Sequence, residues 1–170
     1  MAPRPIDDVP LPDERTIEEV RASCADLGDS PTILAERFYW HLFDLVPEIR
    51  SMFGADMTRQ HERMADVLLQ VVTHLDQPHE VADYLRQLGA HHHQMLGVKP
   101  DHYPFVGRAM VRAIRDLSPV WSSSFSSSWI LVYEWIAATM LAGARARAQQ
   151  MAEGGATEST ARHKRPARSL

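Results

Sequence analysis

The stretch LGAHHHQMLGVKPDHY, residues 88–103, places three consecutive histidines where an apolar helical pattern gives way to a loop. Histidines are candidate metal ligands when they point into a protein, and they are usually solvated when they point out. Neighbours on an α-helix are about 100° apart, so His91, His92 and His93 cannot all face one site. The register of the helix that leads into them decides which one faces inward.

That helix is predicted to begin at Pro78, because proline is favoured at the first helical position. Residues three or four apart share a face of a helix. The apolar face comprises Val81, Leu85 and Leu88. A further step of four along this face leads to His92, whereas the face that carries His93 holds a glycine and an arginine. We therefore predict that His92 points inward, either as a metal ligand or as a boundary residue hydrogen-bonded to a carbonyl.

Apolar residues recur three and four positions apart through the whole middle of the chain, which is the pattern of amphipathic helices. A capping box, Thr16 with Glu19, marks the start of the first helix. The predicted helices run from Thr16 to about Leu27, from the Ser30-Pro31 start signal, over 58–75, from Pro78, from Pro100 and over about 125–148, with a short turn at Pro47. No segment alternates with a period of two. We predict an all-α fold of six to seven helices, either a bundle or a globin-like packing.

The 170 residues are enough for one domain, which we predict over residues 15–150. Residues 1–14 carry four prolines, and residues 151–170 are small, polar and finally basic. Neither end offers much apolar surface to bury, so both are predicted to be disordered.

The formal charge of −4 gives no electrostatic reason to expect nucleic acid or a membrane as a partner. No run approaches the ~20 apolar residues of a membrane span. Cys24 is the only cysteine, which excludes an intramolecular disulfide and fits a reducing cytoplasm, the predicted location. Any of the four tryptophans, Trp40, Trp121, Trp129 and Trp135, that proves exposed would mark a homodimer surface.

Two other predicted helices supply polar groups that could accompany the inward histidine. Gln60 lies one turn before the inward-facing Met64, so it is either a hydrogen-bonding group in an apolar cavity or a solvated residue near a helix start. His61 would take its place if that helix were rotated. Tyr39, next to Phe38, either offers its hydroxyl to the same cavity or fills core space.

Two longer motifs resemble the haem domain of bacterial flavohaemoglobins. RFYWHLFDLVPEIRSMF, residues 37–53, resembles the second and third helices of that domain. The matching positions are Phe38-Tyr39, Leu42-Phe43, Pro47-Glu48 and Phe53. GVKPDHYPFVGRAM, residues 97–110, resembles the segment that follows the haem-binding histidine. The resemblance covers about residues 15–142 and implies a globin-like fold around a haem pocket.

Carried over residue by residue, the resemblance implies a b-type haem whose iron is bound by His92. Phe53 would press against the haem face, and Met64 would lie on the distal side. Tyr39 and Gln60 would donate hydrogen bonds to bound dioxygen. The proximal side and the porphyrin edge would be lined by Leu85, Leu88, Val98, Tyr103 and Val106.

The resemblance also implies a function, which is reversible binding of dioxygen, nitric oxide or carbon monoxide. It implies one enzymatic activity, the conversion of nitric oxide to nitrate. A donor fixed in a dry pocket stabilises the partial negative charge of bound oxygen by ~1.5 to 3 kcal/mol. Two such donors predict slow release, which suits chemistry or sensing better than oxygen transport. The flavin and nicotinamide domains of flavohaemoglobins are not found in the sequence, so we expect an external reductase.

The sequence departs from the flavohaemoglobin pattern at two places. The family's spacing from the histidine to GVKP fits His93, so either the bend after His92 is one residue longer or a helical bulge makes His93 the ligand. The family's glutamate near that histidine falls in LAGARARA, residues 141–148, which holds no acid, and Glu134 lies several turns too early. A strongly electron-rich proximal ligand is therefore not expected.

Two other classes of function are open on the sequence alone. One is a haem-based gas or redox sensor, or a haem-free globin-like signalling module, with its output in one of the two tails. The other is a helical domain in which His91, His92, His93 and His102 bind zinc or nothing.

Overall fold

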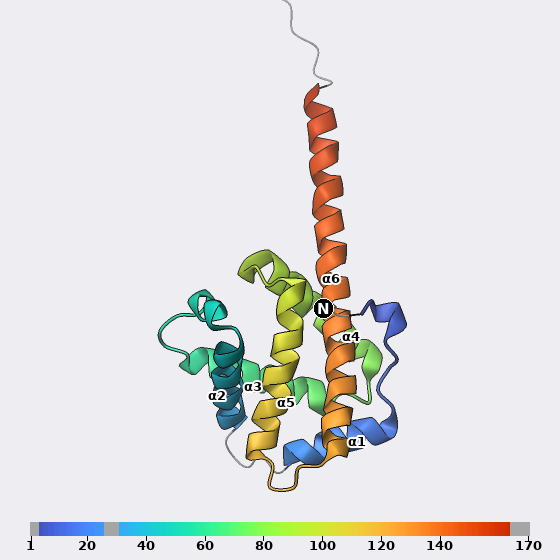
Figure 1. Ribbon diagram of the computed structural model, residues 1–170. Helices are drawn as coiled ribbons and strands as arrows, with labels where there is room; N and C mark the ends of the chain where they lie inside the picture. Colours follow the sequence, from blue (N-terminus) through green and yellow to red (C-terminus); the bar gives the residue numbers. More distant parts are fainter. Residues whose placement is uncertain (1–3, 26–30, 164–170) are drawn as a thin grey trace, which may run out of the picture.

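The computed structural model describes residues 4–25 and 31–163, and all of its regular elements there are helical (Figure 1). In chain order they are η1 (Ile6–Asp8), α1 (Glu14–Ala25), α2 (Pro31–Leu45), η2 (Pro47–Met52), α3 (Thr58–Thr73), α4 (Pro78–Leu96), η3 (Pro100–His102), α5 (Tyr103–Leu117) and α6 (Ser123–His163). The prediction of an all-α fold is confirmed. The predicted start signal at Ser30 and the predicted end at Leu27 lie outside the described residues. No helix in the described ranges is both long enough and apolar enough to cross a membrane.

The first helix is capped differently from the prediction. α1 begins at Glu14, and the side chain of Asp13 accepts a hydrogen bond from the Thr16 amide at 2.8 Å. The predicted capping box of Thr16 with Glu19 is therefore wrong. Asp13 lies three residues before Thr16, which is the spacing at which a carboxylate satisfies a free amide of the first turn. Glu19 is thereby left for a contact with α6.

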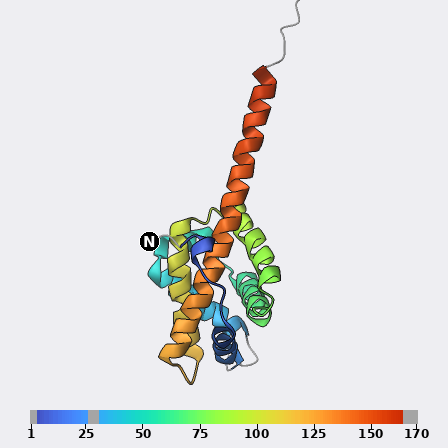
Figure 2. The ribbon, with the colours of Figure 1, turned by 90° about the vertical axis from the view of Figure 1, so that its right-hand side faces the viewer.

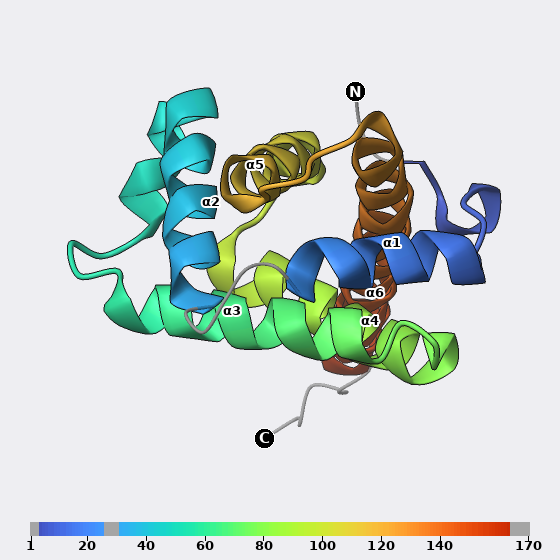
Figure 3. The same ribbon diagram turned by 90° about the horizontal axis from the view of Figure 1, so that it is seen from below.

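The helices enclose a main core built around α5 and α6, and a smaller apolar cluster is formed by Tyr103, Ala137 and Leu141. α4 and α1 pack on α6, while α2 packs on α5 and on α3. Seen from below, α1 crosses α6 and α2 lies at the edge of the molecule (Figure 3). The largest fully buried side chains are Trp129, Leu85, Ile114, Val20 and Val132. Burial of side chains of this size is the main favourable term in the folding of a helical domain.

Polar contacts fasten α1 across the core. The Trp129 indole donates to the Ser23 hydroxyl at 2.7 Å, and both residues are fully buried. Arg21 donates to the carbonyl oxygens of Val72 and Thr73 at the end of α3. A guanidinium group there satisfies terminal carbonyls and complements the negative end of the helix dipole. α1 is thereby tied to both α3 and α6.

Two glycines allow α4 and α6 to cross at very short range. A Cβ atom on Gly89 of α4 would lie 1.9 Å from the carbonyl oxygen of Met140. A Cβ atom on Gly143 of α6 would lie 2.0 Å from the carbonyl oxygen of Arg86. The backbones therefore touch where each helix has no side chain. This crossing fixes the position of α4, the helix that carries the three histidines.

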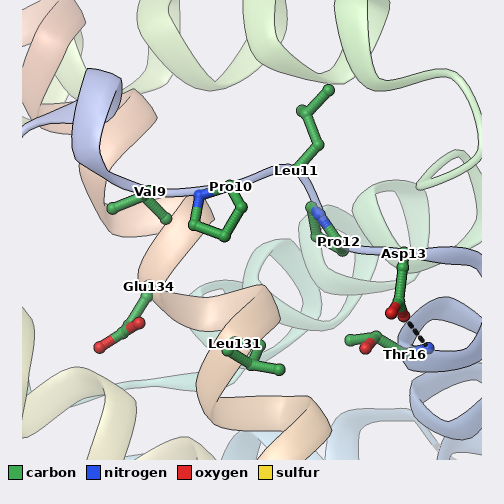
Figure 4. Close-up of a pocket in the computed structure, with 8 residues that line it drawn as sticks. All are labelled: Val9, Pro10, Leu11, Pro12, Asp13, Thr16, Leu131 and Glu134. Carbon is green, nitrogen blue, oxygen red and sulfur yellow. Dashed lines mark hydrogen bonds between the residues drawn. The ribbon is translucent and has the colours of Figure 1, made fainter.

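The described N-terminal residues, which were predicted to be disordered, lie against α6. Val9 is buried, and Arg4 forms an ion pair with Glu134 of α6 at 2.6 Å. A small hollow between this segment and α6 is lined by Val9, Pro10, Leu11, Pro12, Asp13, Thr16, Leu131 and Glu134 (Figure 4). The boundaries of an independently folding unit at residues 15 and 150 stay a prediction.

The last helix is longer than expected. α6 continues to His163, past the end predicted near Ala148, and its final part projects beyond the other helices (Figure 2). Residues 145–154 are exposed. This part of the sequence has no apolar stripe, so its pattern gave no signal of helix beyond the body of the protein.

Candidate functional site

Tyr39 of α2 and Gln60 of α3 form the polar centre of the candidate site. The Gln60 side-chain amide donates to the Tyr39 hydroxyl oxygen at 2.7 Å. Tyr39 is only 5% exposed, and Gln60 is half-buried. Burial raises the pKa of Tyr39 because it disfavours the phenolate. The hydroxyl is therefore neutral, and because it accepts from Gln60, its own hydrogen remains available for donation.

Aromatic side chains surround this hydroxyl-bearing ring. Phe38, Phe43 and Phe53 have ring centroids 4.9 Å, 5.7 Å and 5.3 Å from that of Tyr39. The imidazole of His61 packs on the same ring at 5.5 Å. Gln60 and His61 thus both touch Tyr39, but Gln60 alone makes the hydrogen bond. Tyr39 is therefore enclosed mainly by aromatic rings.

A loop contact that the sequence did not reveal supports this aromatic cluster. The Arg50 guanidinium donates to the carbonyl oxygens of Phe53 and Gly54 at 3.1 Å and 3.0 Å. It also lies 5.2 Å from the ring centroid of Phe43. Arg50 therefore fixes the turn that presents Phe53. Its position within the predicted short turn, only three residues before Phe53, was the one available sign.

His92 of α4 is half-buried, whereas His91 and His93 are exposed. The Nδ1–H group of His92 donates to the carbonyl oxygen of Leu88 at 2.8 Å. This bond places the proton on Nδ1 and leaves the lone pair of Nε2 without a hydrogen-bond partner in the described part of the chain. Burial lowers the pKa of His92, which favours the neutral imidazole that metal binding requires.

The face of α4 that carries His93 serves a different purpose. Arg86 and Gly89, which share it, are the positions that pack directly on α6. The side chain of Gln94, next in the chain, accepts from Arg147 of α6 at 3.3 Å. The register predicted for His92 therefore agrees with the packing of the helix.

α4 ends four residues after His92 in a glycine turn. It is continuous α-helix from Pro78 to Leu96, without a bulge. Gly97 adopts a φ of 65°, and the Val98 amide donates to the His92 carbonyl at 3.2 Å. Only glycine takes up this left-handed conformation without strain. Residues 78–96 thus show no helical bulge, and the assignment of His92 rather than His93 as the ligand stays a prediction.

The side chains of the remaining predicted site residues are either half-buried or buried. Phe53, Met64, Leu88, Val98 and Val106 are half-buried, while Leu85 and Tyr103 are buried. α3 and α4 follow one another in the chain, yet α3 packs mainly on α2 and α4 on α6. Burial raises the pKa of Tyr103 to about 12. None of the predicted side chains points fully into solvent.

Two expectations concern residues outside this set. Glu134 forms an ion pair with Arg4, and the inference that it lies too early in α6 to serve His92 stays a prediction. His102 accepts a hydrogen bond from the Lys99 amide at 3.2 Å. Among residues 4–25 and 31–163, no three His, Cys, Asp or Glu side chains come close enough to hold a metal ion, so the zinc hypothesis finds no support.

Comparison with known proteins identifies this fold. Residues 36–140 match the family model named Globin. The chain belongs to the globin family. A flavohemoprotein from Bacillus thuringiensis subsp. konkukian is 32% identical over 108 residues, which cover 62% of this chain and 27% of that protein. A globin-like protein from Aquifex aeolicus is 26% identical over 129 residues, which cover 75% of this chain and 91% of that protein.

Solved structures show the same fold. A bacterial globin from Campylobacter jejuni, 22% identical, aligns with a TM-score of 0.68 over 78% of this chain and 96% of its own. An engineered carbene transferase from Rhodothermus marinus, described as a putative nitric oxide dioxygenase, is 26% identical. It aligns with a TM-score of 0.69 over 84% of this chain and 98% of its own. The predicted globin-like fold is confirmed.

Membership of the globin family implies haem binding, and the side chains of this globin fit that group. The lone pair of His92 Nε2 is a suitable ligand for iron, and its second nitrogen is already oriented by Leu88. The apolar ring of haem would suit the half-buried apolar side chains among the predicted site residues, which are Phe53, Met64, Leu88, Val98 and Val106. Tyr39 and Gln60 supply donors for a polar ligand on α2 and α3.

Proposed function

We propose that this globin holds haem b through His92 and binds dioxygen and other diatomic gases reversibly on the side of Tyr39 and Gln60. We further propose that it converts nitric oxide to nitrate when an external reductase supplies electrons. When bound, haem supplies an iron atom that takes a diatomic ligand and exchanges electrons. The observation that carries the proposal is the part-buried hydrogen bond from Gln60 to Tyr39.

The chain's own residues set the affinity for the gas. Tyr39 keeps its proton because burial raises its pKa, and Gln60 occupies its oxygen as an acceptor. The free hydroxyl hydrogen would then be donated to a ligand with partial negative charge. A hydrogen bond of this kind contributes ~1.5 to 3 kcal/mol, roughly tenfold to a hundredfold in retention.

The surrounding residues protect this hydrogen bond from water. Phe38, Phe43 and Phe53 pack around Tyr39, and Arg50 holds the turn that carries Phe53. A fixed donor in such surroundings stabilises charge without having to reorganise. We therefore expect high affinity for dioxygen and slow release of it, which suit oxygen chemistry better than oxygen transport.

On the proximal side, where His92 would hold the iron, the imidazole is polarised only weakly. His92 donates to the neutral carbonyl of Leu88, and Glu134 is occupied by Arg4. A carbonyl orients an imidazole but adds less electron density than a carboxylate would. The distal donors, rather than the proximal histidine, would therefore carry most of the chemical control.

The electron donor belongs to the proposal. The matched flavohemoproteins are far longer than this globin, which covers 27% of the relative from Bacillus thuringiensis. Nitric oxide, dioxygen and one electron together give nitrate, so each turnover needs one electron from a reductase. Cys24 is a free, half-buried thiol, which accords with a reducing cytoplasm as the proposed location.

The test is nitrate formation by the haem-reconstituted protein, with nitric oxide, dioxygen and a flavin reductase present. Wild type and Tyr84→Phe, which removes an exposed hydroxyl, should form nitrate at the same rate. Tyr39→Phe should be slower. A haem-loaded protein that forms no nitrate would contradict the enzymatic part and leave reversible gas binding. A protein that binds no haem would contradict the whole proposal and favour a signalling role.

A further inference from the structure

We propose that the outer face of α2 is the surface at which two copies of this globin associate. This outer face carries Ile33, Arg37, Trp40 and Asp44, with Glu36 on the other flank of Trp40, and all five side chains are exposed. Trp40 is 60% exposed, whereas the tryptophans of α6, Trp129 and Trp135, are buried. Tryptophan and arginine are the residues most enriched at the centres of protein interfaces.

The four residues form one stripe. At 100° per residue, Ile33 lies about 20° from Trp40 around the helix axis, and Arg37 and Asp44 lie about 60° and 40° to the same side. α2 lies at the edge of the molecule, where it packs on α3 and α5, and Asp116 of α5 borders the stripe beside Arg37 (Figure 3). Because all four side chains are exposed, a partner can reach the stripe.

The order of charges along the stripe points to a second copy as the partner. In a two-fold symmetric dimer, each contact is made twice with the roles exchanged. Arg37 and Asp44 lie on opposite sides of Trp40 along the helix and on the same flank of it. Two α2 helices packed antiparallel about Trp40 would therefore bring each Arg37 against the partner's Asp44. The two tryptophans would meet between these two ion pairs.

Both charged groups are available for such a pairing. Arg37 lies 6.0 Å over the Trp40 ring and 4.0 Å from Asp116, with its side chain 46% exposed. An exposed pair at that distance contributes little to stability. Asp44 is exposed and makes no ion pair with any other described residue. In a dimer, each of these groups gains a partner without losing a strong one.

The size of the surface predicts a reversible dimer. One face of a 15-residue helix is smaller than the ~800 Å² per partner that stable complexes bury. We therefore expect association in the micromolar to millimolar range of protein concentration. The site residue Tyr39 lies on the inner side of α2, so association does not depend on haem or gas binding.

The experiment is sedimentation equilibrium of the full chain over that concentration range. Wild type should show a monomer–dimer equilibrium that Trp40→Ala abolishes. Val120→Ala, which shortens a side chain 67% exposed outside the stripe, should leave it unchanged. Circular dichroism confirms that each variant is folded.

The decisive comparison is charge reversal. Arg37→Asp alone and Asp44→Arg alone should each weaken association at least tenfold, because like charges then face each other. The double variant should recover most of the loss, because both ion pairs reappear with their signs exchanged. Arg37→Asp also loses the contact with Asp116, but the double variant shares that loss and so serves as its control. A strictly monomeric wild type, or a dimer indifferent to Trp40→Ala and to both single reversals, would overturn the proposal.

Discussion

The close crossing of α4 and α6 predicts that a single methyl group at Gly89 destabilises the protein. Alanine normally stabilises a helix by about 1 kcal/mol relative to glycine. At Gly89, however, the added Cβ would lie 1.9 Å from the Met140 carbonyl oxygen. The shortest ordinary carbon–oxygen contact is about 3.3 Å, so the two helices must separate by roughly 1.4 Å. The obstacle is helical backbone, which cannot rotate away as a side chain could.

The expected sign of the Gly89→Ala effect is therefore reversed. Overpacking in a core costs about 1 to 3 kcal/mol, and a backbone obstacle places this case near the upper end. The free energy of unfolding should fall by about 2 kcal/mol in a urea titration of the apoprotein. Haem affinity should fall as well, because Gly89 lies three residues before His92 on the displaced helix.

Two further glycine variants control this prediction. Gly143→Ala should behave like Gly89→Ala, since its Cβ would lie 2.0 Å from the Arg86 carbonyl oxygen. Gly54→Ala should be tolerated, because its Cβ would meet no neighbouring atom closer than 3.9 Å. An unfolding free energy for Gly89→Ala equal to or above that of wild type would refute the proposed crossing.

Three further outcomes can be checked. Tyr39→Phe should raise the dioxygen dissociation rate roughly tenfold to a hundredfold in stopped-flow measurements, and an unchanged rate would exclude Tyr39 as a donor. Ser23→Ala leaves the buried Trp129 indole without its acceptor and should lower the unfolding free energy by about 1 to 3 kcal/mol; a neutral effect in urea denaturation would argue against that bond. Hydrogen bonds from Ser128 and Ser124 lower the pKa of Glu19 in the folded state. The contribution of the Glu19 carboxylate to folding stability is therefore fully present above its ordinary pKa of 4.5 and is lost as the pH falls through its lowered pKa. Glu19→Gln should therefore reduce the loss of stability that acid denaturation shows below pH 4.5.

The sequence was informative where structure depends on local register. The apolar face from Val81 to Leu88 is repeated every turn, so the half-buried position of His92 followed from spacing alone. The Tyr39–Gln60 contact was not visible in the same way. It depends on how α2 and α3 pack, and the resemblance to flavohaemoglobins implied only that both side chains would face one bound ligand.

Features that depend on distant partners could not be read from the sequence. Glu19 was assigned to a capping box, but it is bound by Ser124 and Ser128, more than 100 residues away in the chain. Gly89 is the glycine on the helix face that carries His93, and its role appears only when Met140 is placed against it. An exposed tryptophan, Trp40, could not be distinguished from buried ones until the helices were packed.

The most direct test of the central claim, that His92 holds haem, is the visible absorption spectrum of the ferrous protein with carbon monoxide after haem addition. Wild type and His93→Ala should show the same histidine-ligated carbon monoxide spectrum at one haem per chain, and His92→Ala should lose it. Retention of the spectrum in His92→Ala together with its loss in His93→Ala would contradict the account and move the ligand by one residue.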